Sequence, residues 1–392
     1  MVKLIILALF ILLVIIIVNH FSNLNATNIE GMVNIPKFKG DIKFTRNKNC
    51  RYKMSKTIKY ILEKHGIEGT KKDDWALYLP CTYNNMKKEV SDADYKDTNQ
   101  RLFLIDNADQ LVGKNTIWKN LVDSYGRDKA TKMMPRTYVL SDEDDMKLFD
   151  QEFTPKKLYI LKKNIQRQEG LLITNKKKEI LKGINDKFVI VQELLQDPYL
   201  IDGRKTNMRF YLLIVCKEGE IDAYVHNDGF MYYTAKKFKQ GCKESGPNIT
   251  TGYIDRKVYE ENPLTHKDFR AYLDNHDRIL SPAEINVLAH RQKISNHVFN
   301  SIYKLISTVV EGLDTKICQN SKLDNVITFQ LFGVDIAVND QLQPQIMEIN
   351  KGPDLGAKGP RDKKVKYGMV EDMLKIMKIL PGINHGFIKV LE

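Results

Sequence analysis

The sequence contains few of the residues that build metal clusters or disulfide frameworks. Its 392 residues include five cysteines, an odd number, and no CxxC pair or cluster of cysteine and histidine occurs. These absences exclude a zinc site of recognisable spacing and a disulfide scaffold, and they favour a reducing compartment. The sequence also lacks the HExxH, GxxxxGK(S/T) and GxSxG motifs, so it carries no zinc-protease, P-loop or nucleophile-elbow signature.

Internal repeats and low-complexity tracts are absent as well. Hydrophobic residues make up 43% and charged residues 28% of the chain, which is close to the globular average. This composition excludes a mostly disordered, a collagen-like or a polytopic membrane protein. At roughly 100–200 residues per domain, the length predicts two or three domains.

The balance of charge is basic. Lys and Arg number 61 against 49 Asp and Glu, so the formal net charge is 61 − 49 = +12. Such a surplus favours acidic partners, namely phosphates, anionic lipid, nucleic acid or an acidic polypeptide tail. A solvated basic surface would give the same surplus, so charge alone does not choose among these.

One long hydrophobic run occurs, from Leu4 to Val18. With its flanks it is about 17 residues long, the lower limit for crossing a membrane. We expect an uncleaved single-pass anchor over residues 1–20, with a cleaved signal or a buried helix as alternatives. Nine Lys or Arg against two Asp or Glu occupy residues 20–60, which predicts that the larger part faces the cytosol. Residues 21–50 lack periodicity and indicate a linker.

Beyond the linker, short hydrophobic runs alternate with helical patterns, which indicates an α/β fold. We expect an N-terminal α/β domain over residues 51–140, a central subdomain over 141–235 and a C-terminal subdomain over 236–392. The expected strands cover residues 75–79, 102–105, 137–140, 158–161, 170–174, 188–192, 208–216, 221–225, 334–338 and 345–349. The expected helices cover residues 52–64, 116–125, 265–312 and 365–379.

The most informative segment is a predicted hairpin over residues 329–350. Side chains at i and i+2 share one face of a strand, so Glu348 and Asn350 point the same way, and Asp335 lies on the facing strand. Two carboxylates and an amide are hard oxygen donors that suit Mg²⁺, which takes its other ligands from water and nucleotide phosphates. Solvated acids on a surface hairpin are the alternative, but the apolar neighbours indicate buried strands.

Three other segments carry polar side chains of the same kind. Lys205, Asn207 and Arg209 alternate along a strand and share a face that suits phosphate and ribose. Lys162 ends the strand Leu158-Tyr-Ile-Leu and precedes a polar loop. The hydrophobic strand Val189-Ile-Val runs into Gln192-Glu193-Leu194, whose backbone could meet an adenine edge. Each of these segments, taken alone, also fits an ordinary strand.

In this order, the four segments resemble the tubulin-tyrosine-ligase-like family of the ATP-grasp superfamily over about residues 75–380. The segment Asp197-Pro-Tyr-Leu-Ile-Asp-Gly-Arg-Lys205-Thr-Asn-Met-Arg209 is similar to the family signature Pro-Leu-Leu-Ile…Gly-x-Lys-Phe-Asp-(Leu/Ile)-Arg. The segment Arg167-Gln-Glu-Gly170-Leu resembles the family's flexible loop. The resemblance implies an ATP-grasp fold with a smaller N-terminal α/β domain. It also implies ATP-dependent C–N ligation, in which a carboxylate becomes an acyl phosphate and is attacked by an amine.

The resemblance further implies ATP and Mg²⁺ as cofactors, an amino acid as donor, and an acidic, tubulin-like protein tail as acceptor; no nucleic acid partner is expected. Lys205 and Arg209 are the implied catalytic residues. The implied nucleotide-binding residues are Lys162, Gln192, Glu193, Leu194, Lys205 and Asn207, and the implied metal ligands are Asp335, Glu348 and Asn350.

The sequence departs from the family pattern at several positions. Asn207 stands where the family usually has Asp, and Gln168 replaces a usual glycine. Tyr232 aligns with an arginine that the family places near the transferred phosphate, and tyrosine is neutral. Asn248-Ile-Thr-Thr251 replaces the usual His-Leu-Thr-Asn. Two alternatives therefore remain open: an ATP-grasp ligase with a small-molecule acceptor, or a degenerate ligase that binds nucleotide or tubulin as an anchor protein.

The basic surplus is concentrated in two segments. Residues 155–182 hold nine Lys or Arg against two acids, and residues 358–378 hold seven against three. The first segment contains the expected nucleotide loop, and the second follows the expected metal strand. We expect an acidic tail to dock there, with Lys363, Lys364 and Lys366 as contact residues.

Overall fold

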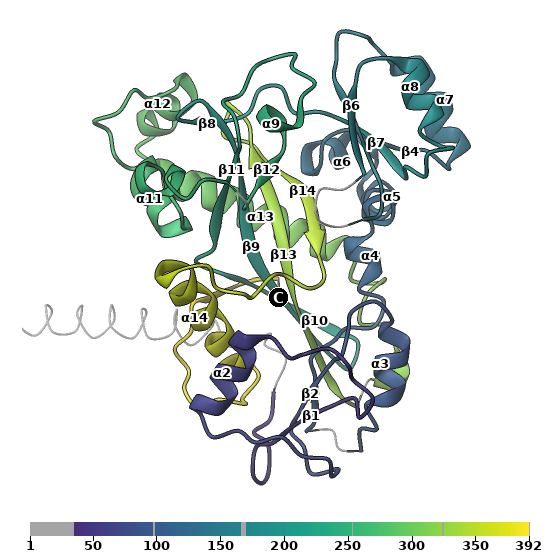
Figure 1. Ribbon diagram of the computed structural model, residues 1–392, viewed down its shortest axis with the longest axis vertical. Helices are drawn as coiled ribbons and strands as arrows, with labels where there is room; N and C mark the ends of the chain where they lie inside the picture. Colours follow the sequence, from purple (N-terminus) through teal and green to yellow (C-terminus); the bar gives the residue numbers. More distant parts are fainter. Residues whose placement is uncertain (1–34, 97–98, 166–169, 253, 324, 392) are drawn as a thin grey trace, which may run out of the picture.

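The computed structural model describes residues 35–96, 99–165, 170–252, 254–323 and 325–391. Two β-sheets with helices around them make up this part of the chain (Figure 1). In that view, the larger sheet runs down the middle of the molecule, and the smaller one lies at the upper right beside α7 and α8. The mixed α/β class predicted from the sequence is confirmed, and the architecture is consistent with an ATP-grasp fold.

The larger sheet has the strand order β1-β2-β3-β13-β9-β10-β15, with β14 on β13 and with β8 and β11 on β9. The pairs from β1 to β13 are parallel and those from β13 to β15 are antiparallel. Its strands are β1 (Phe44–Arg46), β2 (Leu77–Leu79), β3 (Arg101–Leu102), β8 (Leu200–Ile201), β9 (Arg204–Lys217), β10 (Glu220–His226), β11 (Phe230–Thr234), β12 (Thr250–Thr251), β13 (Ile327–Val338), β14 (Pro344–Asn350) and β15 (Phe387–Leu391).

The smaller sheet is antiparallel and has the order β4-β7-β5-β6. One face of it packs on α7 and α8 through a cluster that includes Tyr138, Phe149 and Tyr159. The opposite face holds a second apolar cluster, which includes Ile160, Ile173 and Leu194. Its strands are β4 (Thr137–Val139), β5 (Tyr159–Lys162), β6 (Leu171–Thr174) and β7 (Ile190–Glu193).

The helices cover the faces of both sheets, and α2 packs against α14 at the lower left of Figure 1. The described helices are α2 (Lys56–Lys64), α3 (Met86–Asp92), α4 (Asp109–Val112), α5 (Lys114–Tyr125), α6 (Arg127–Met133), α7 (Glu143–Glu152), α8 (Lys177–Lys182), α9 (Ser245–Asn248), α10 (Val258–Glu261), α11 (His266–Leu273), α12 (Pro282–Ala289), α13 (Ile294–Glu311) and α14 (Pro360–Ile376).

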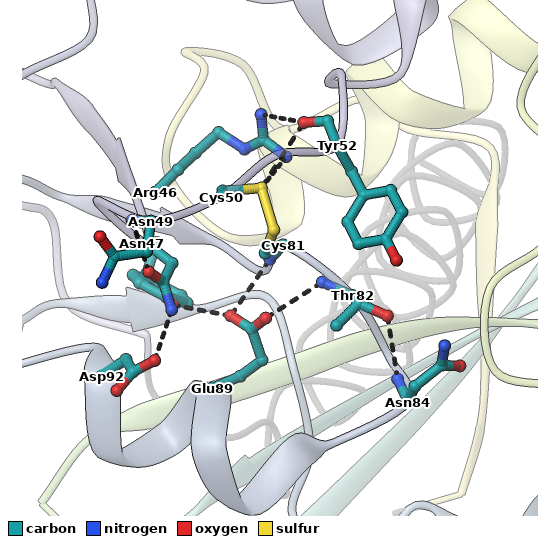
Figure 2. The surroundings of a disulfide bond; sticks show 11 residues. Arg46, Asn47, Asn49, Cys50, Tyr52, Cys81, Thr82, Asn84, Glu89 and Asp92 are labelled. Atoms are coloured by element: carbon teal, nitrogen blue, oxygen red, sulfur yellow. Dashed lines mark hydrogen bonds between the residues drawn. A yellow bond between two sulfur atoms is a disulfide. The ribbon is translucent and has the colours of Figure 1, made fainter.

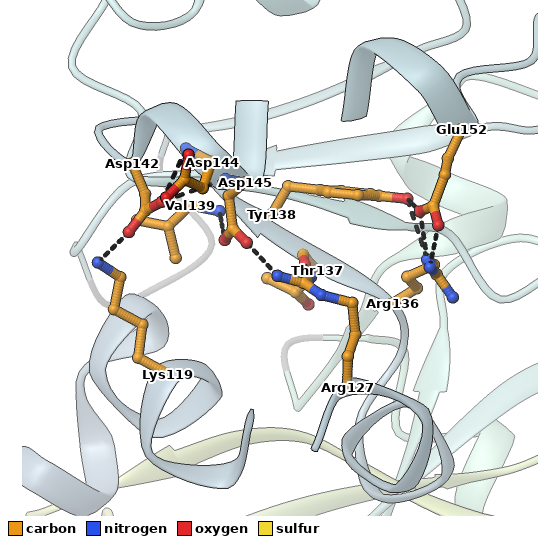
Figure 3. A network of polar contacts seen from close by, with 10 residues as sticks. All are labelled: Lys119, Arg127, Arg136, Thr137, Tyr138, Val139, Asp142, Asp144, Asp145 and Glu152. Carbon is orange, nitrogen blue, oxygen red and sulfur yellow. Dashed lines mark hydrogen bonds and ion pairs between the residues drawn. The ribbon is translucent and has the colours of Figure 1, made fainter. Parts of the chain in front are cut away.

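A polar network joins the smaller sheet to α5 and α6 (Figure 3). Arg127, on α6, pairs with the buried Asp145 of α7 and also donates to the Thr137 carbonyl of β4. The second oxygen of Asp145 accepts from the Val139 amide at 2.7 Å. Lys119, on α5, reaches Asp142 at 2.6 Å. These contacts fix the sheet that carries Lys162 relative to the helix pair beneath it.

Most expected elements beyond the linker are present with shifted ends. The expected helix over residues 265–312 is instead three helices, α11, α12 and α13, and of the expected strand over residues 102–105 only Leu102 lies in a strand, β3. The expected domain boundaries stay a prediction, although β1, β2 and β3 belong to the same sheet as β13. One hydrophobic core extends from Ile58 in α2 to Phe387 in β15. Part of the expected linker is ordered, because β1 pairs in parallel with β2.

The expected membrane anchor over residues 1–20 lies outside the described residues. Among the residues that the structure describes, no helix has the length and apolar character needed to cross a membrane. The anchor and the cytosolic orientation therefore stay predictions.

The expectation against disulfides is wrong. Cys50 bonds to Cys81, and Cys216 bonds to Cys318, which leaves Cys242 as the free cysteine. An odd count and wide spacing did not exclude pairing, because the fold brings together cysteines 31 and 102 residues apart in the sequence.

Candidate active site

The centre of the site is a row of three charged side chains across β9, β13 and β14. Asp335 pairs in register with Arg209 on one side and with Glu348 on the other, so all three point to the same face. Arg209 binds Asp335 through both arms: its Nε donates to Oδ1 at 2.6 Å and its Nη2 donates to Oδ2 at 2.9 Å. Burial raises the pKa of Asp335, and the guanidinium of Arg209 opposes that shift.

Glu348 is held by a lysine that lies far away in the sequence. Lys114, the first residue of α5, donates from Nζ to Glu348 Oε1 at 2.7 Å and also approaches the Ile165 carbonyl at 3.4 Å. Its side chain is 13% exposed, and that of Glu348 is 31% exposed. Each carboxylate of the row therefore has its own cation.

Asn350 lies beside the row. It is in register with Gly333, two residues before Asp335, and it shares the face of Glu348. The pairing of β13 and β14 shifts by one residue after Asp335, which leaves Met347 as the extra residue of a bulge. The bulge lies next to Glu348 and sets the direction of the last residues of β14.

Lys162 enters the same space from the smaller sheet. It is 9% exposed, and its Nζ donates to Gln192 Oε1 at 2.7 Å and approaches the Met347 carbonyl at 3.5 Å. Burial lowers its pKa to about 8, although the nearby Glu348 charge acts in the opposite direction. Lys114, Lys162, Gln192 and Glu348 line one small cavity together with apolar side chains of α5, β7 and β14.

Lys205 forms a further buried cation on β9. It is 6% exposed, donates to the Leu195 carbonyl at 2.6 Å and lies over the ring of Phe238. Burial lowers its pKa to about 8 as well. Asn207 lies between Lys205 and Arg209 on the same face and pairs in register with Tyr232 of β11.

The expected adenine hinge contributes mainly its apolar surroundings. The amides of Glu193 and Leu194 donate to Arg136 and Leu158 at 2.8 and 2.9 Å, and the Glu193 carboxylate binds Lys157. The Gln192 side chain orients Lys162 and donates to Thr137 Oγ1 at 2.7 Å. The apolar cluster of Leu158, Ile160, Ile173 and Leu194 lies on the face of β5 that Lys162 shares, where a base could pack.

Tyr232 lies under the guanidinium of Arg209, with 5.3 Å between the guanidinium carbon and the ring centroid. Burial raises its pKa to about 12, so the phenol is neutral at physiological pH. The ring supplies a cation–π surface for Arg209 and no charge of its own.

The predicted metal ligands carry donor atoms of the type that a magnesium ion prefers, while in the structure the Asp335 and Glu348 carboxylates bind Arg209 and Lys114. Within the described residues no group of three His, Cys, Asp or Glu side chains converges as a metal site would require. The predicted set therefore depends on the amide of Asn350 as its third donor. Hard oxygens from two carboxylates and an amide match the preference of Mg²⁺, which leaves its other positions to water and phosphate.

The structure thus brings together most of the predicted residues and adds one. Arg209, Asp335 and Glu348 form one row, and Lys162 lines the same small cavity as Glu348. Lys114 was missed, because no local motif marks it and only the tertiary structure brings the start of α5 to Glu348 of β14. Arg167 and Gln168 of the expected flexible loop lie outside the described residues.

The prediction that Lys366 contacts the acidic tail is wrong. Lys366 is 4% exposed and donates to the Gly356 carbonyl at 2.6 Å, so it holds the segment after β14 and is not open to a partner. Lys363 and Lys364 are exposed.

Comparison with known proteins identifies relatives of this chain. Human tubulin polyglutamylase TTLL6 is 22% identical over 346 residues, or 84% of the chain. A probable beta-tubulin polyglutamylase of Tetrahymena thermophila is 26% identical over 68% of the chain, and human tubulin monoglutamylase TTLL4 is 25% identical over 84%. The matches cover 36%, 23% and 28% of these longer proteins.

The family-level match covers most of the chain. The sequence profile of the tubulin-tyrosine ligase family matches residues 92–385, which include every residue of the site described above. The chain therefore belongs to the tubulin-tyrosine ligase family.

Proposed function

We propose that this protein is an ATP- and Mg²⁺-dependent ligase that joins an amino acid to an acidic protein tail. The observation that carries the proposal is the convergence of Lys114, Lys162 and Arg209 on the carboxylates Asp335 and Glu348. Three cations and two hard-oxygen acids in one partly buried site match the charges of a nucleotide triphosphate and its metal ion.

Burial of the lysines supports a phosphate ligand. A buried ammonium loses hydration, and both Lys162 and Lys205 have pKa values lowered to about 8. An anionic phosphate chain beside them would raise these pKa values and favour the charged forms. The apolar cluster around Ile160 and Leu194 would hold the base at the other end of the nucleotide.

The chemistry that fits this site is phosphoryl transfer followed by amide formation. A substrate carboxylate oxygen bonds to the γ-phosphorus while the bond to ADP breaks. The amine nitrogen then forms the amide bond, phosphate leaves, and the amine loses a proton to solvent. Mg²⁺ held by Asp335, Glu348 and Asn350 would neutralise phosphate charge, while Lys162, Lys205 and Arg209 orient the nucleotide.

Glutamate is the donor that the relatives favour, because two of the three relatives above are named polyglutamylases and the third a monoglutamylase. Their names also favour a tubulin-like tail as acceptor. The basic segments 155–182 and 358–378 support an acidic acceptor by charge complementarity.

The neutral Tyr232 favours one alternative, a protein that binds nucleotide but does not ligate. The test is incorporation of labelled glutamate into a glutamate-rich peptide by the purified chain, with and without ATP and Mg²⁺. We expect incorporation that needs both, and at least a hundredfold loss in Glu348→Gln. Glu143→Gln, on the exposed first turn of α7, is the matched control and should keep full activity.

The nucleotide is measured separately by the shift in melting temperature that Mg-ATP produces. A shift without incorporation would leave the binding protein as the better description. If Mg-ATP produces no shift and no glutamate is incorporated, both the ligase function and the nucleotide site are refuted.

A further inference from the structure

The first disulfide closes between two loops that other contacts already position (Figure 2). Arg46 donates to the Tyr52 carbonyl at 3.2 Å and to Cys50 Sγ at 3.2 Å, and Cys50 N donates to the Asn47 carbonyl at 3.0 Å. These bonds hold the turn that carries Cys50. The disulfide therefore joins a turn that hydrogen bonds already hold to the loop that carries Cys81, with 5.3 Å between the Cα atoms.

The loop of Cys81 is held by a buried carboxylate. Glu89 is 3% exposed and accepts from the amides of Cys81 and Thr82, each at 3.1 Å. The hydroxyl of Tyr78 donates to the same carboxylate at 2.8 Å. Polar contacts other than the disulfide bond itself thus position both loops that carry the first disulfide.

The second disulfide lies at the end of the strand pair that carries the site. Cys216 is the penultimate residue of β9, is 4% exposed and is in register with Thr328 of β13. Cys318 lies between α13 and β13, with 5.5 Å between the two Cα atoms. The cross-link ties β9, which bears Arg209, to the entry into β13, which bears Asp335.

Both Cα separations lie within the usual range for disulfides, roughly 4.4–6.8 Å. Four of the five cysteines come together in two such pairs from four distant segments. Structural disulfides form and persist in oxidising compartments and are rare in the cytosol, where thiols are kept reduced. The apolar run from Leu4 to Val18 gives the chain a segment that could direct it to a membrane or across it.

We propose that the ligase domain folds and acts in the oxidising lumen of the secretory route, and that its acceptor is an acidic protein that passes through that lumen. This inference rests on the proposed function for the nature of the acceptor, and on the disulfides for the compartment. It reverses the cytosolic orientation expected from the flanking charges. It also implies an acceptor that differs from the tubulin for which the relatives are named.

The compartment is tested first by counting thiols. The full chain is produced in eukaryotic cells with its own N-terminus and alkylated in denaturant before and after reduction. We expect one alkylated thiol before reduction, that of Cys242, and five after it. Cys242→Ser should show none before reduction, and Cys81→Ser should show two. Five alkylated thiols in the unreduced wild type would overturn the proposal.

A glycan reports the side of the membrane directly. Asp277→Thr creates an Asn-His-Thr acceptor at Asn275, which is exposed after α11. Asp277→Ala changes the same position without creating an acceptor. We expect an additional glycosidase-sensitive mass shift in Asp277→Thr relative to Asp277→Ala. Equal glycosidase-sensitive mass shifts in the two variants would place the domain in the cytosol and overturn the proposal.

The acceptor is tested with one glutamate-rich tail on two carriers, one with a secretion signal and one without. We expect the tail to gain amino-acid mass on the secreted carrier alone. A gain on the cytosolic carrier alone would overturn the inference while the ligase function stands. If neither tail gains mass, the proposed function fails, and the thiol and glycan results still decide the compartment.

Discussion

At the scale of single residues, the site depends on lysine side chains that are buried. Lys162 and Lys205 are more than nine-tenths buried, and Lys114 is nearly so. A buried cation is stable only beside acceptors or anions, and here it faces carbonyls, an amide oxygen and a carboxylate. Such a site suits the anionic nucleotide that we propose as its ligand.

The first prediction concerns Lys114. Lys114→Ala removes the cation that holds Glu348, so we expect Mg-ATP to bind about 10–100-fold more weakly, because a hydrogen bond to a charged group contributes about 1.5–3 kcal/mol. Titration calorimetry measures the affinity. Lys129→Ala changes an exposed lysine of the neighbouring helix α6, and it should bind normally. Equal affinities in both variants would remove Lys114 from the nucleotide site.

A second prediction concerns His266, which is fully buried against Phe210 and Phe299. Burial lowers its pKa well below the usual value of about 6.5. The unfolded chain therefore binds a proton that the folded chain does not, so stability is lost as the pH falls below about 6.5. The loss reaches at most about 1.4 kcal/mol per pH unit.

Urea unfolding at about pH 7.5 and about pH 5.5 measures this loss, with His266→Phe as the test variant. The variant should lose less stability on acidification than the wild type. His276→Phe, at an exposed position after α11, should follow the wild type. A wild-type pH dependence in His266→Phe would assign the effect to other groups.

At the scale of elements, burial on both faces of a strand determines where the strand begins and ends. The sequence predicts a strand over residues 334–338, but β13 begins at Ile327, because the run Ile327-Thr-Phe-Gln-Leu-Phe is buried on both faces and shows no alternation. At α14 the helix begins at Pro360, an N-terminal position that proline favours. Periodicity located these elements, and burial and capping set their ends.

The third prediction tests how closely β13 approaches its neighbours. A Cβ on Gly333 would lie 3.2 Å from Arg209 Cδ and from Pro353 Cβ, so a side chain at this position would crowd the guanidinium. We expect Gly333→Val to displace Arg209 from Asp335, to reduce ligation at least tenfold and to lower the unfolding free energy by about 1–3 kcal/mol.

Ligation assays and urea unfolding give the two readouts. Gly368→Ala in α14 is the control, since a Cβ there meets nothing within 4 Å. This control should keep full activity and gain up to about 1 kcal/mol in stability. Full activity in Gly333→Val would show that the space beside Arg209 is not needed.

At the scale of the whole molecule, the net charge of +12 governs how an acidic tail approaches. Lys363 and Lys364, on the first turn of α14, are exposed, whereas Lys366 is buried and serves the fold. We expect the double variant Lys363→Gln, Lys364→Gln to bind a glutamate-rich peptide more weakly and to keep its Mg-ATP affinity. The reason is that exposed charges act by screened Coulomb attraction.

Peptide titration at about 0.05 M and about 0.3 M salt measures the effect, since the Debye length is about 10 Å at 0.1 M. The wild type should lose affinity at the higher salt. Lys71→Gln with Lys72→Gln, an exposed pair before β2, is the control and should bind as the wild type does. Salt-independent and equal affinities would favour a small-molecule acceptor.

The sequence by itself determined the features that depend on local geometry. The period of two along a strand placed Lys205, Asn207 and Arg209 on one face, and likewise Glu348 and Asn350. The alternation of short strands with helices gave the α/β class. These properties are written within a few residues of each other, so they can be derived without knowing the fold.

Only the tertiary structure decided which distant residues meet. Lys114 reaches Glu348 across 234 positions, and Cys216 meets Cys318 across 102. The burial of Lys366, which removed it from the expected docking surface, likewise follows from the segment folded over it. Contacts of this kind are set by how helices and sheets pack, and no local period or motif encodes that packing.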